Sequence, residues 1–168
     1  MGVTFQREKF AATIDEAKPL LVRHWAELAR NRGSIAFNPD YEGYLRLETA
    51  DILRVYTVRE NRILIGYAVY LVSKHYHYKD HLWAASDMFW LDPAKRSKRR
   101  PWWKRALGIG RKPGLGTQLF GFIESELHRE GISVMHTTLK AAHPAAARML
   151  RNLGHESIEL GFAKLLRG

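Results

Sequence analysis

An uncharged apolar run at residues 63–72 constrains the fold more than any other part of this sequence. At ten residues it is half the length of the ~20-residue helix that spans a membrane. It consists of aliphatic and tyrosine side chains with a single glycine. Runs of this kind, bounded by turn signals, are typical of strands that are buried on both faces. Residues 63–72 therefore predict a central strand with structure packed against each side.

Further strands are predicted next to this run. Residues 52–58 are rich in β-forming side chains, and Glu60-Asn61-Arg62 is a hairpin-turn candidate that joins them to the run. The polar and aromatic segment 75–80 then leads to a third strand at 82–91, which ends at Asp92 and Pro93.

The remaining periodic segments predict helices before and after these strands. Thr13 and Glu16 have the spacing of a capping box, so a helix is expected to begin there, kinked or divided at Pro19. Helical spacing also predicts helices at 41–47, 116–129 and 144–152, with a strand at 132–139 and one or two final strands at 156–165. This order of elements indicates one mixed α/β domain, residues 1–168.

The net charge of +10 comes from one segment of the chain. Residues 94–112 contain nine Lys and Arg and no acidic residue, whereas the other 149 residues carry 18 basic and 17 acidic side chains. Between Lys95 and Arg105 the bases are interleaved with Trp102 and Trp103, a mixture that can hold phosphates and stack on nucleic-acid bases. Nucleic acid, an acidic protein and a second copy in a homodimer are the partners that this segment suggests, and a solvated loop is the alternative.

The chain has no cysteine, which excludes disulfides, Cys-ligated metals and Cys nucleophiles. No secretory signal pattern is visible, and no apolar stretch reaches the length of a membrane span. A cytoplasmic location without a membrane partner is the resulting expectation.

A glycine-containing loop before the 116–129 helix is the strongest candidate binding site. Gly114 and Gly116 lack Cβ atoms, so an anion can approach the main chain closely. The first N–H groups of a helix have no partner within the helix and lie at its positive end. Together these features suit a pyrophosphate, although two glycines at a tight helix entry are an equally good explanation of the pattern alone.

The loop resembles the Q/R-x-x-G-x-G/A signature of the GNAT N-acetyltransferase superfamily, which it matches at Arg111, Gly114 and Gly116. Residues 91–96 are similar to the strand-end pattern V-x-P-x-x-R of that family, and residues 143–155 are similar in spacing to its N-x-x-A…Y-x-x-x-G-F segment. Most of the chain from Trp25 onward can be placed in this way. It is particularly similar to the small GNAT-like proteins of bacteriophages and prophages, which implies a bacterial or phage-infected host cell.

The resemblance implies a GNAT fold, a central, mostly antiparallel, twisted sheet of six to seven strands that is splayed after the fourth strand and flanked by helices. It also implies that the chain transfers an acetyl group from acetyl-CoA, its co-substrate, to a primary amine of an unidentified acceptor by direct attack. The residues that would bind acetyl-CoA are Phe89, Trp90, Leu91, Arg111, Lys112, Gly114, Leu115, Gly116, Thr117 and His143.

The sequence departs from the family pattern at two places that matter for function. The glycines follow Arg111 rather than Arg96, which indicates an insertion at 97–110 within the cofactor loop. Leu150 stands where the family has the tyrosine often assigned as general acid, so no general acid is assigned.

Asp87 is the candidate general base, because an acceptor ammonium must lose a proton before it attacks. Side chains alternate along a strand, so Asp87, Phe89 and Leu91 are expected to share a face, with Asp87 about 13 Å from Leu91 toward the acceptor. A structural ion pair with a nearby Lys, Arg or His is the alternative role for Asp87. We expect His75, His77 and Tyr78 to line the acceptor site and no metal to bind there, since these histidines have no carboxylate at ligand spacing.

A second interpretation is a binding protein with the same fold and little or no catalysis. It would engage nucleic acid or an acidic partner through residues 95–105. Leu150 favours this interpretation, whereas the match at Arg111, Gly114 and Gly116 favours the enzyme.

Overall fold

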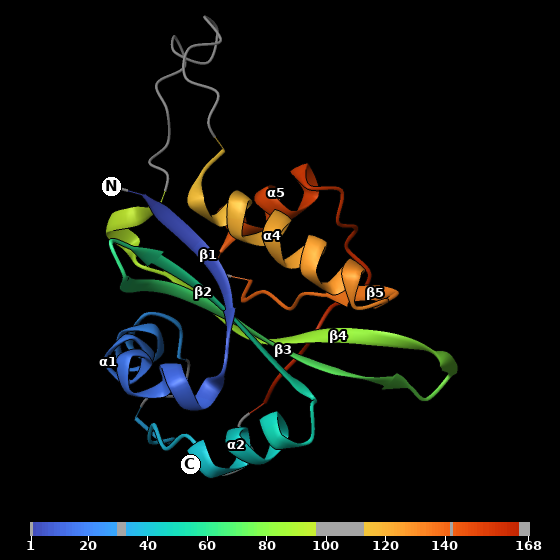
Figure 1. Cartoon of the computed structure of the whole chain (residues 1–168), viewed down its shortest axis with the longest axis horizontal. Helices are drawn as coiled ribbons and strands as arrows, with labels where there is room; N and C mark the ends of the chain where they lie inside the picture. The colour runs from blue at the N-terminus through green and yellow to red at the C-terminus, as the bar shows by residue number, and fades with distance from the viewer. Residues whose placement is uncertain (1, 30–32, 97–112, 142, 165–168) are drawn as a thin grey trace, which may run out of the picture.

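The computed structural model describes residues 2–29, 33–96, 113–141 and 143–164, which form one sheet with helices on both of its sides (Figure 1). The strand order follows the chain, with antiparallel pairing from the first strand to the fourth and parallel pairing of the fifth to the fourth. The strands are β1 (Val3–Glu8), β2 (Leu53–Glu60), β3 (Ile63–His75), β4 (Tyr78–Leu91) and β5 (Val134–His136).

The apolar run forms β3, the central strand of the sheet, as predicted. Its side chains alternate between two clusters: Tyr67 and Val69 pack on one side of the sheet, and Ala68 and Tyr70 on the other. The turn between β2 and β3 is the predicted one, with Asn61 and Arg62 at φ 51° and 71°. Two successive residues with positive φ are the geometry of a tight hairpin turn that matches the twist of the strands.

Two helices cover each side of the sheet in the described part of the chain (Figure 1). On one side, α1 (Phe10–Leu28) and α2 (Tyr41–Thr49) pack against Tyr67 and Val69. On the other, α4 (Leu115–Arg129) packs against Ala68 and Tyr70, with α5 (Pro144–Asn152) beside it. None of the described helices is long and apolar enough to cross a bilayer.

Helix α1 begins earlier than its sequence pattern predicts, and the capping-box assignment is wrong. The Thr13 hydroxyl lies inside the helix and donates to the carbonyl oxygens of Lys9 and Phe10. The free N–H groups at the start of α1 are instead satisfied from α2, because the Glu48 carboxylate accepts from Phe10 N at 2.5 Å and from Ala11 N at 3.2 Å. This cap joins residues far apart in the sequence, so a local pattern does not reveal it. The helix continues through Pro19.

The strands differ from the sequence prediction at both ends of the chain. Strand β1 was not predicted because residues 2–8 are mostly polar, yet its apolar side chains, Val3 and Phe5, pack on the α4 side of the sheet. The final strands expected at 156–165 are absent from residues 156–164, all of which are exposed and carry no regular structure. The described residues therefore form five strands, and the expected six to seven are not confirmed.

Candidate functional site

The sheet opens between β4 and β5. These strands pair only at Trp83–Val134, Ala84–Met135 and Ala85–His136. Beyond this point the chain after β5 keeps one link to β4, a hydrogen bond of 2.8 Å from Thr138 N to the Ser86 hydroxyl. The outer edge of β4 from Asp87 to Leu91 thus has no strand partner among the described residues, which is the splay expected after the fourth strand.

The N-terminus of α4 supplies main-chain donors near this open edge, since the Phe89 ring packs edge-to-face on Phe120 of α4 at 5.2 Å. Gly114 is the N-cap with an extended backbone, and no side chain caps the helix. The N–H groups of Leu115, Gly116 and Thr117 have no acceptor among the described residues. They are half-buried donors at the positive end of a helix, and such donors suit a phosphate group.

Gly116 has a second reason to be glycine. A Cβ atom at this position would lie 2.9 Å from the Met149 sulfur of α5, closer than a normal contact. The missing side chain therefore lets α4 and α5 approach each other. The geometry at this residue is compatible with the close approach of an anion, which the sequence suggested, and with the close packing of α5, which the sequence did not suggest.

The end of β4 divides its side chains between the two sides of the sheet. Phe89 and Leu91 pack with the α4 cluster. Trp90 is buried on the α1 side, where its indole N–H donates to Glu27 at 2.9 Å. The Leu91 carbonyl accepts from Arg96 Nε at 2.8 Å, which uses one of its two lone pairs. The main-chain groups of Trp90 face Tyr67 of β3, because Asp92 N, two positions further on, donates to the Ile65 carbonyl at 2.8 Å. Neither the side chain nor the main chain of Trp90 therefore lies at the open edge.

Asp87 does not share a face with Phe89 and Leu91, contrary to the expectation from strict alternation. Val69 pairs with Met88 and the next residue, Tyr70, pairs with Ser86, so Asp87 is an extra residue in β4. Such a β-bulge shifts the alternation by one position. Asp87 accepts a hydrogen bond of 2.5 Å from the hydroxyl of Tyr44 on α2, which places it on the α2 side of the sheet.

The Tyr44 hydroxyl is held as a donor to Asp87. Burial raises the pKa of Tyr44, and the hydrogen bond to Asp87 raises it further. The ring stacks on Phe10 at 5.2 Å. The sequence does not single out Tyr44, because its hydrogen bond to Asp87 depends on how α2 is placed against β4.

His24 and Tyr67 form a second hydrogen-bonded pair on this side of the sheet, partly buried and joined at 2.8 Å. Burial lowers the pKa of His24 to about 4, so the imidazole is neutral at physiological pH. Burial raises the pKa of Tyr67, and the nearby Tyr44 and Asp87 add to this effect. The structure therefore shows His24 as a partly buried residue that is hydrogen-bonded to Tyr67.

Arg96, the arginine of the strand-end pattern, ties β4 to α1. Its guanidinium binds both carboxylate oxygens of Glu27, at 2.5 and 2.8 Å. The hydrogen bond to Arg96 lowers the pKa of Glu27 to about 2, although partial burial opposes the shift. His143, which precedes α5, is close enough to lower the pKa of both Glu27 and His24 slightly.

His75, His77 and Tyr78 lie far from this region, at the tip of the β3–β4 hairpin (Figure 1). The His75 ring lies 4.2 Å from Trp83, and Tyr78 stacks on the same indole at 6.0 Å. Nine strand positions separate Tyr78 from Asp87, which corresponds to about 30 Å along β4. The structure therefore does not bring these residues together with Asp87. No three His, Asp or Glu side chains in the described ranges are placed to hold a metal ion.

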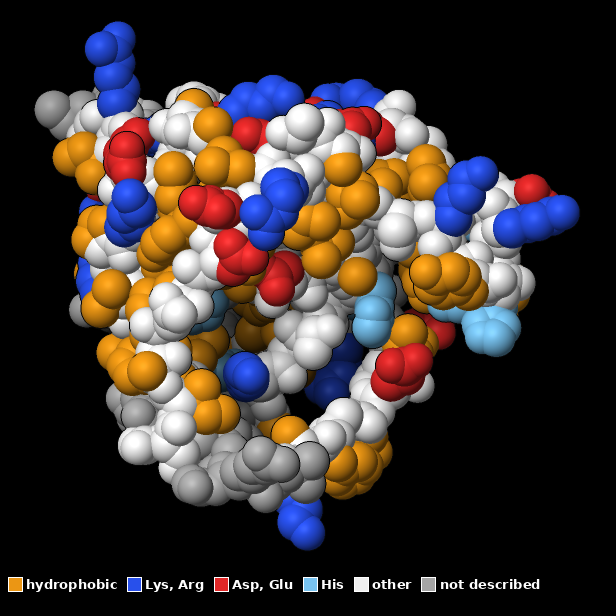
Figure 2. Space-filling view, turned by 90° about the horizontal axis from the view of Figure 1, so that it is seen from below, with side chains coloured by type: hydrophobic (Ala, Val, Ile, Leu, Met, Phe, Trp, Pro, Cys, Tyr) orange, Lys and Arg blue, Asp and Glu red, His pale blue; other side chains and the backbone are white. Residues whose placement is uncertain are grey.

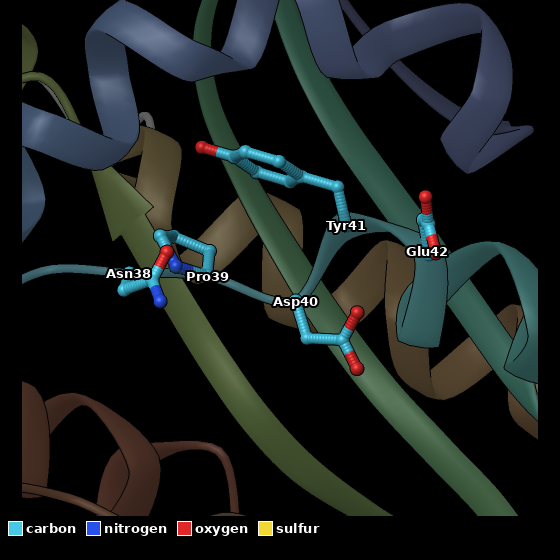
Figure 3. A pocket seen from close by; sticks show the side chains of 5 residues that line it. All are labelled: Asn38, Pro39, Asp40, Tyr41 and Glu42. Atoms are coloured by element: carbon cyan, nitrogen blue, oxygen red, sulfur yellow. The ribbon is translucent and has the colours of Figure 1, made fainter.

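Two shallow features lie on the α2 side of the molecule. The molecule is hollowed when seen from below Figure 1, and histidine and basic side chains appear inside the hollow (Figure 2). A separate open pocket of ≈ 400 Å³ is formed by the segment that enters α2. There the Tyr41 ring extends toward α1 while the Asp40 carboxylate points away and caps α2 through Gly43 N (Figure 3). The lining residues are Asn38, Pro39, Asp40, Tyr41 and Glu42.

Several residues predicted for the site lie outside the described residues. They include Arg111, Lys112 and nearly all of the basic tryptophan segment at 95–105. Within that segment Lys95 and Arg96 are described, and both are paired with carboxylates, Glu60 and Glu27. Leu150, at the position of the usual tyrosine, is buried.

The same architecture is found in solved structures of acetyltransferases. An aminoglycoside acetyltransferase from an uncultured soil metagenomic sample, in complex with sisomicin, has a TM-score of 0.69 at 13% identity, over 98% of this chain and 97% of that one. A ribosomal-protein-alanine N-acetyltransferase from Brucella melitensis has a TM-score of 0.63 at 13% identity, over 99% of this chain and 100% of that one. A predicted acetyltransferase from Clostridium acetobutylicum, solved with acetyl-CoA, has a TM-score of 0.63 at 12% identity, over 98% of this chain and 97% of that one.

The chain has the GNAT fold. No protein-family model matches the sequence, and no curated protein matches it. At 12–13% identity these structural similarities establish the fold alone. Within the GNAT fold, the open β4 edge and the free start of α4 are the candidate functional site of this chain.

Proposed function

We propose that this chain is an acetyl-CoA-dependent N-acetyltransferase that acts on a primary amine. The observation that carries the proposal is the parting of β4 from β5 next to an α4 N-terminus with three half-buried N–H groups that find no acceptor in the described part of the chain. An open strand edge offers main-chain partners to an extended pantetheine, and the helix N-terminus suits its pyrophosphate. The solved GNAT structures, one of them with acetyl-CoA, support the same use of this fold.

The residues of the chain fit the cofactor with one restriction. Gly114, Leu115, Gly116 and Thr117 would hold the pyrophosphate through their main chain, and Phe89 and Leu91, whose main-chain groups face away from β3, would pair with the pantetheine through theirs. The restriction concerns Trp90, whose side chain is buried on the α1 side and whose main chain faces β3. The Leu91 carbonyl accepts from Arg96 but keeps a second lone pair. Arg111, Lys112 and His143 complete the proposed cofactor site. When bound, acetyl-CoA supplies a thioester activated toward amines.

Asp87 is the proposed general base. Its carboxylate accepts the proton that the acceptor ammonium loses, directly or through a water molecule. Tyr44 holds this carboxylate in place by donating to one of its oxygens, which leaves the other free to accept the proton. Main-chain N–H groups at the open edge of β4 would donate to the oxygen that becomes negatively charged during attack. A structural role for Asp87 predicts loss of stability, rather than loss of rate, when it is replaced.

The cofactor proposal is tested by calorimetry with acetyl-CoA on the matched pair Leu115→Pro and Leu115→Ala. Proline is tolerated at the first helical position and removes only that N–H, and the extended Gly114 suits the residue before a proline. Both variants lose the same side-chain packing. We expect Leu115→Pro to bind roughly tenfold or more weakly than Leu115→Ala, since a hydrogen bond to a charged group is worth about 1.5–3 kcal/mol. Equal affinities, or no binding to the unaltered chain below 1 mM, would reject the proposal.

The catalytic proposal is tested by assaying acetyl transfer to a panel of peptides, polyamines and aminoglycosides. Asp87→Asn is expected to lower kcat/KM by about 10²–10⁴ with unchanged acetyl-CoA affinity, and Tyr44→Phe by a smaller factor. Full activity of Asp87→Asn would remove Asp87 from the mechanism while leaving the cofactor site intact.

A further inference from the structure

The segment 156–164 has no partner among the described residues of its own molecule. Up to His155 the chain is fixed: its ring pairs with Glu124 at 2.9 Å, and its N–H donates to the Leu150 carbonyl. After it, every residue to 164 is exposed, and no hydrogen bond, ion pair or ring contact joins any of them to the rest of the described chain. In Figure 1 this segment belongs to the dark red trace that leaves α5.

Large apolar side chains occupy alternate positions of this segment. Ile158, Leu160 and Phe162 are 62, 85 and 94% exposed. Three such side chains with period two would lie on one face of a strand. A patch of this kind on a soluble domain is typical of a surface that contacts another molecule.

The sequence of the segment is complementary to itself. In an antiparallel pair of two copies centred on Leu160, that residue faces its own copy and Ile158 faces Phe162. At the two ends of the same face, Glu156 faces Lys164, so opposite charges meet. The opposite face pairs Ser157 with Ala163 and Glu159 with Gly161, and no like charges oppose each other.

We propose that residues 156–164 of two copies pair as this antiparallel ribbon and form a two-fold symmetric dimer. A self-complementary patch is what a two-fold interface requires. The free edge of β5 is a poorer acceptor, because β5 has three residues and the segment has nine. A two-stranded ribbon is marginally stable alone, so we expect dissociation in roughly the micromolar range. The dimer does not depend on the proposed acetyl transfer.

The absence of cysteine makes a crosslinking test direct. In the proposed register Leu160→Cys places two sulfurs opposite each other, within the Cα spacing of a disulfide. Ile158→Cys is the matched control, because its own copy lies about 14 Å farther along the ribbon. We expect Leu160→Cys to form a disulfide-linked dimer on mild oxidation and Ile158→Cys to form little of it. The double variant Ile158→Cys with Phe162→Cys should again form the disulfide-linked dimer. Equal crosslinking of both single variants would overturn the register.

Sedimentation over a concentration series tests the dimer itself. Leu160→Glu, which opposes two negative charges on the axis, is expected to be monomeric throughout. Ile63→Glu alters another exposed isoleucine (68%) and is expected to leave the dimer unchanged. Glu156→Lys should weaken the dimer several-fold, and addition of Lys164→Glu should restore it. A monomeric unaltered chain at all concentrations, or a dimer insensitive to Leu160→Glu, would overturn the proposal.

Discussion

Gly116 provides the sharpest test of whether the glycines of the α4 loop serve a ligand or helix packing. In Gly116→Ala the new Cβ would lie 2.9 Å from the Met149 sulfur. Overpacking in a rigid core costs about 1–3 kcal/mol, but the end of a methionine side chain moves easily, so the lower end of this range applies here. Alanine in a helix is favoured over glycine by up to about 1 kcal/mol. The two effects nearly cancel, and the free energy of unfolding should change by less than about 1 kcal/mol.

The assay combines thermal unfolding with acetyl-CoA calorimetry on Gly116→Ala and on Gly116→Ala with Met149→Ala. For a chain of this length 1 kcal/mol corresponds to about 2–4 °C in Tm. If a pyrophosphate approaches Gly116, both variants should lose affinity, because the Cβ remains when Met149 is shortened. If the glycine serves packing alone, the double variant should bind like Met149→Ala. A Tm loss well beyond 4 °C that Met149→Ala does not reverse would refute the packing argument.

Two further predictions concern stability. Arg96 lowers the pKa of the Glu27 carboxyl from 4.5 to about 2. The contribution of this ion pair to the free energy of unfolding is therefore fully present above about pH 4.5 and is lost as the pH falls toward 2. Solvent screening at this quarter-exposed side chain limits that contribution to roughly 1–2 kcal/mol. The Tm difference between the unaltered chain and Glu27→Gln should therefore shrink between pH 5 and pH 2.5, and a constant difference would contradict the assignment. Glu48→Ala removes the cap of α1 and should cost about 1–2 kcal/mol in urea unfolding, whereas the exposed Glu42→Ala, which lies at 3.9 Å from Arg46, should cost less than about 0.5 kcal/mol.

Sequence reasoning succeeded where the signal is local. The 144–152 helix was predicted with both of its ends correct, because Pro144 starts it and Gly154, at φ 94°, follows its end. The central position of β3 follows from its uninterrupted apolar run, since burial on both faces removes the polar alternation of an outer strand.

The prediction failed where partners come from elsewhere in the chain. The cap of α1 is Glu48, 38 residues from the N–H group that it accepts from. The bulge at Asp87 exists only in the pairing of β4 with β3, so strict alternation placed Asp87 on the wrong face. The alternating apolar residues after His155 do have a strand pattern, but no strand of the described chain pairs with them.

Helix α2 is linked at its two ends to different parts of the molecule. Tyr44 on its first turn bonds Asp87 in the candidate site, and Glu48 on its last turn holds the first amides of α1. An acceptor that pushes α2 away from β4 would therefore also loosen the start of α1. Amide hydrogen exchange at Phe10 and Ala11 would then report events at Asp87, although neither residue touches the acceptor.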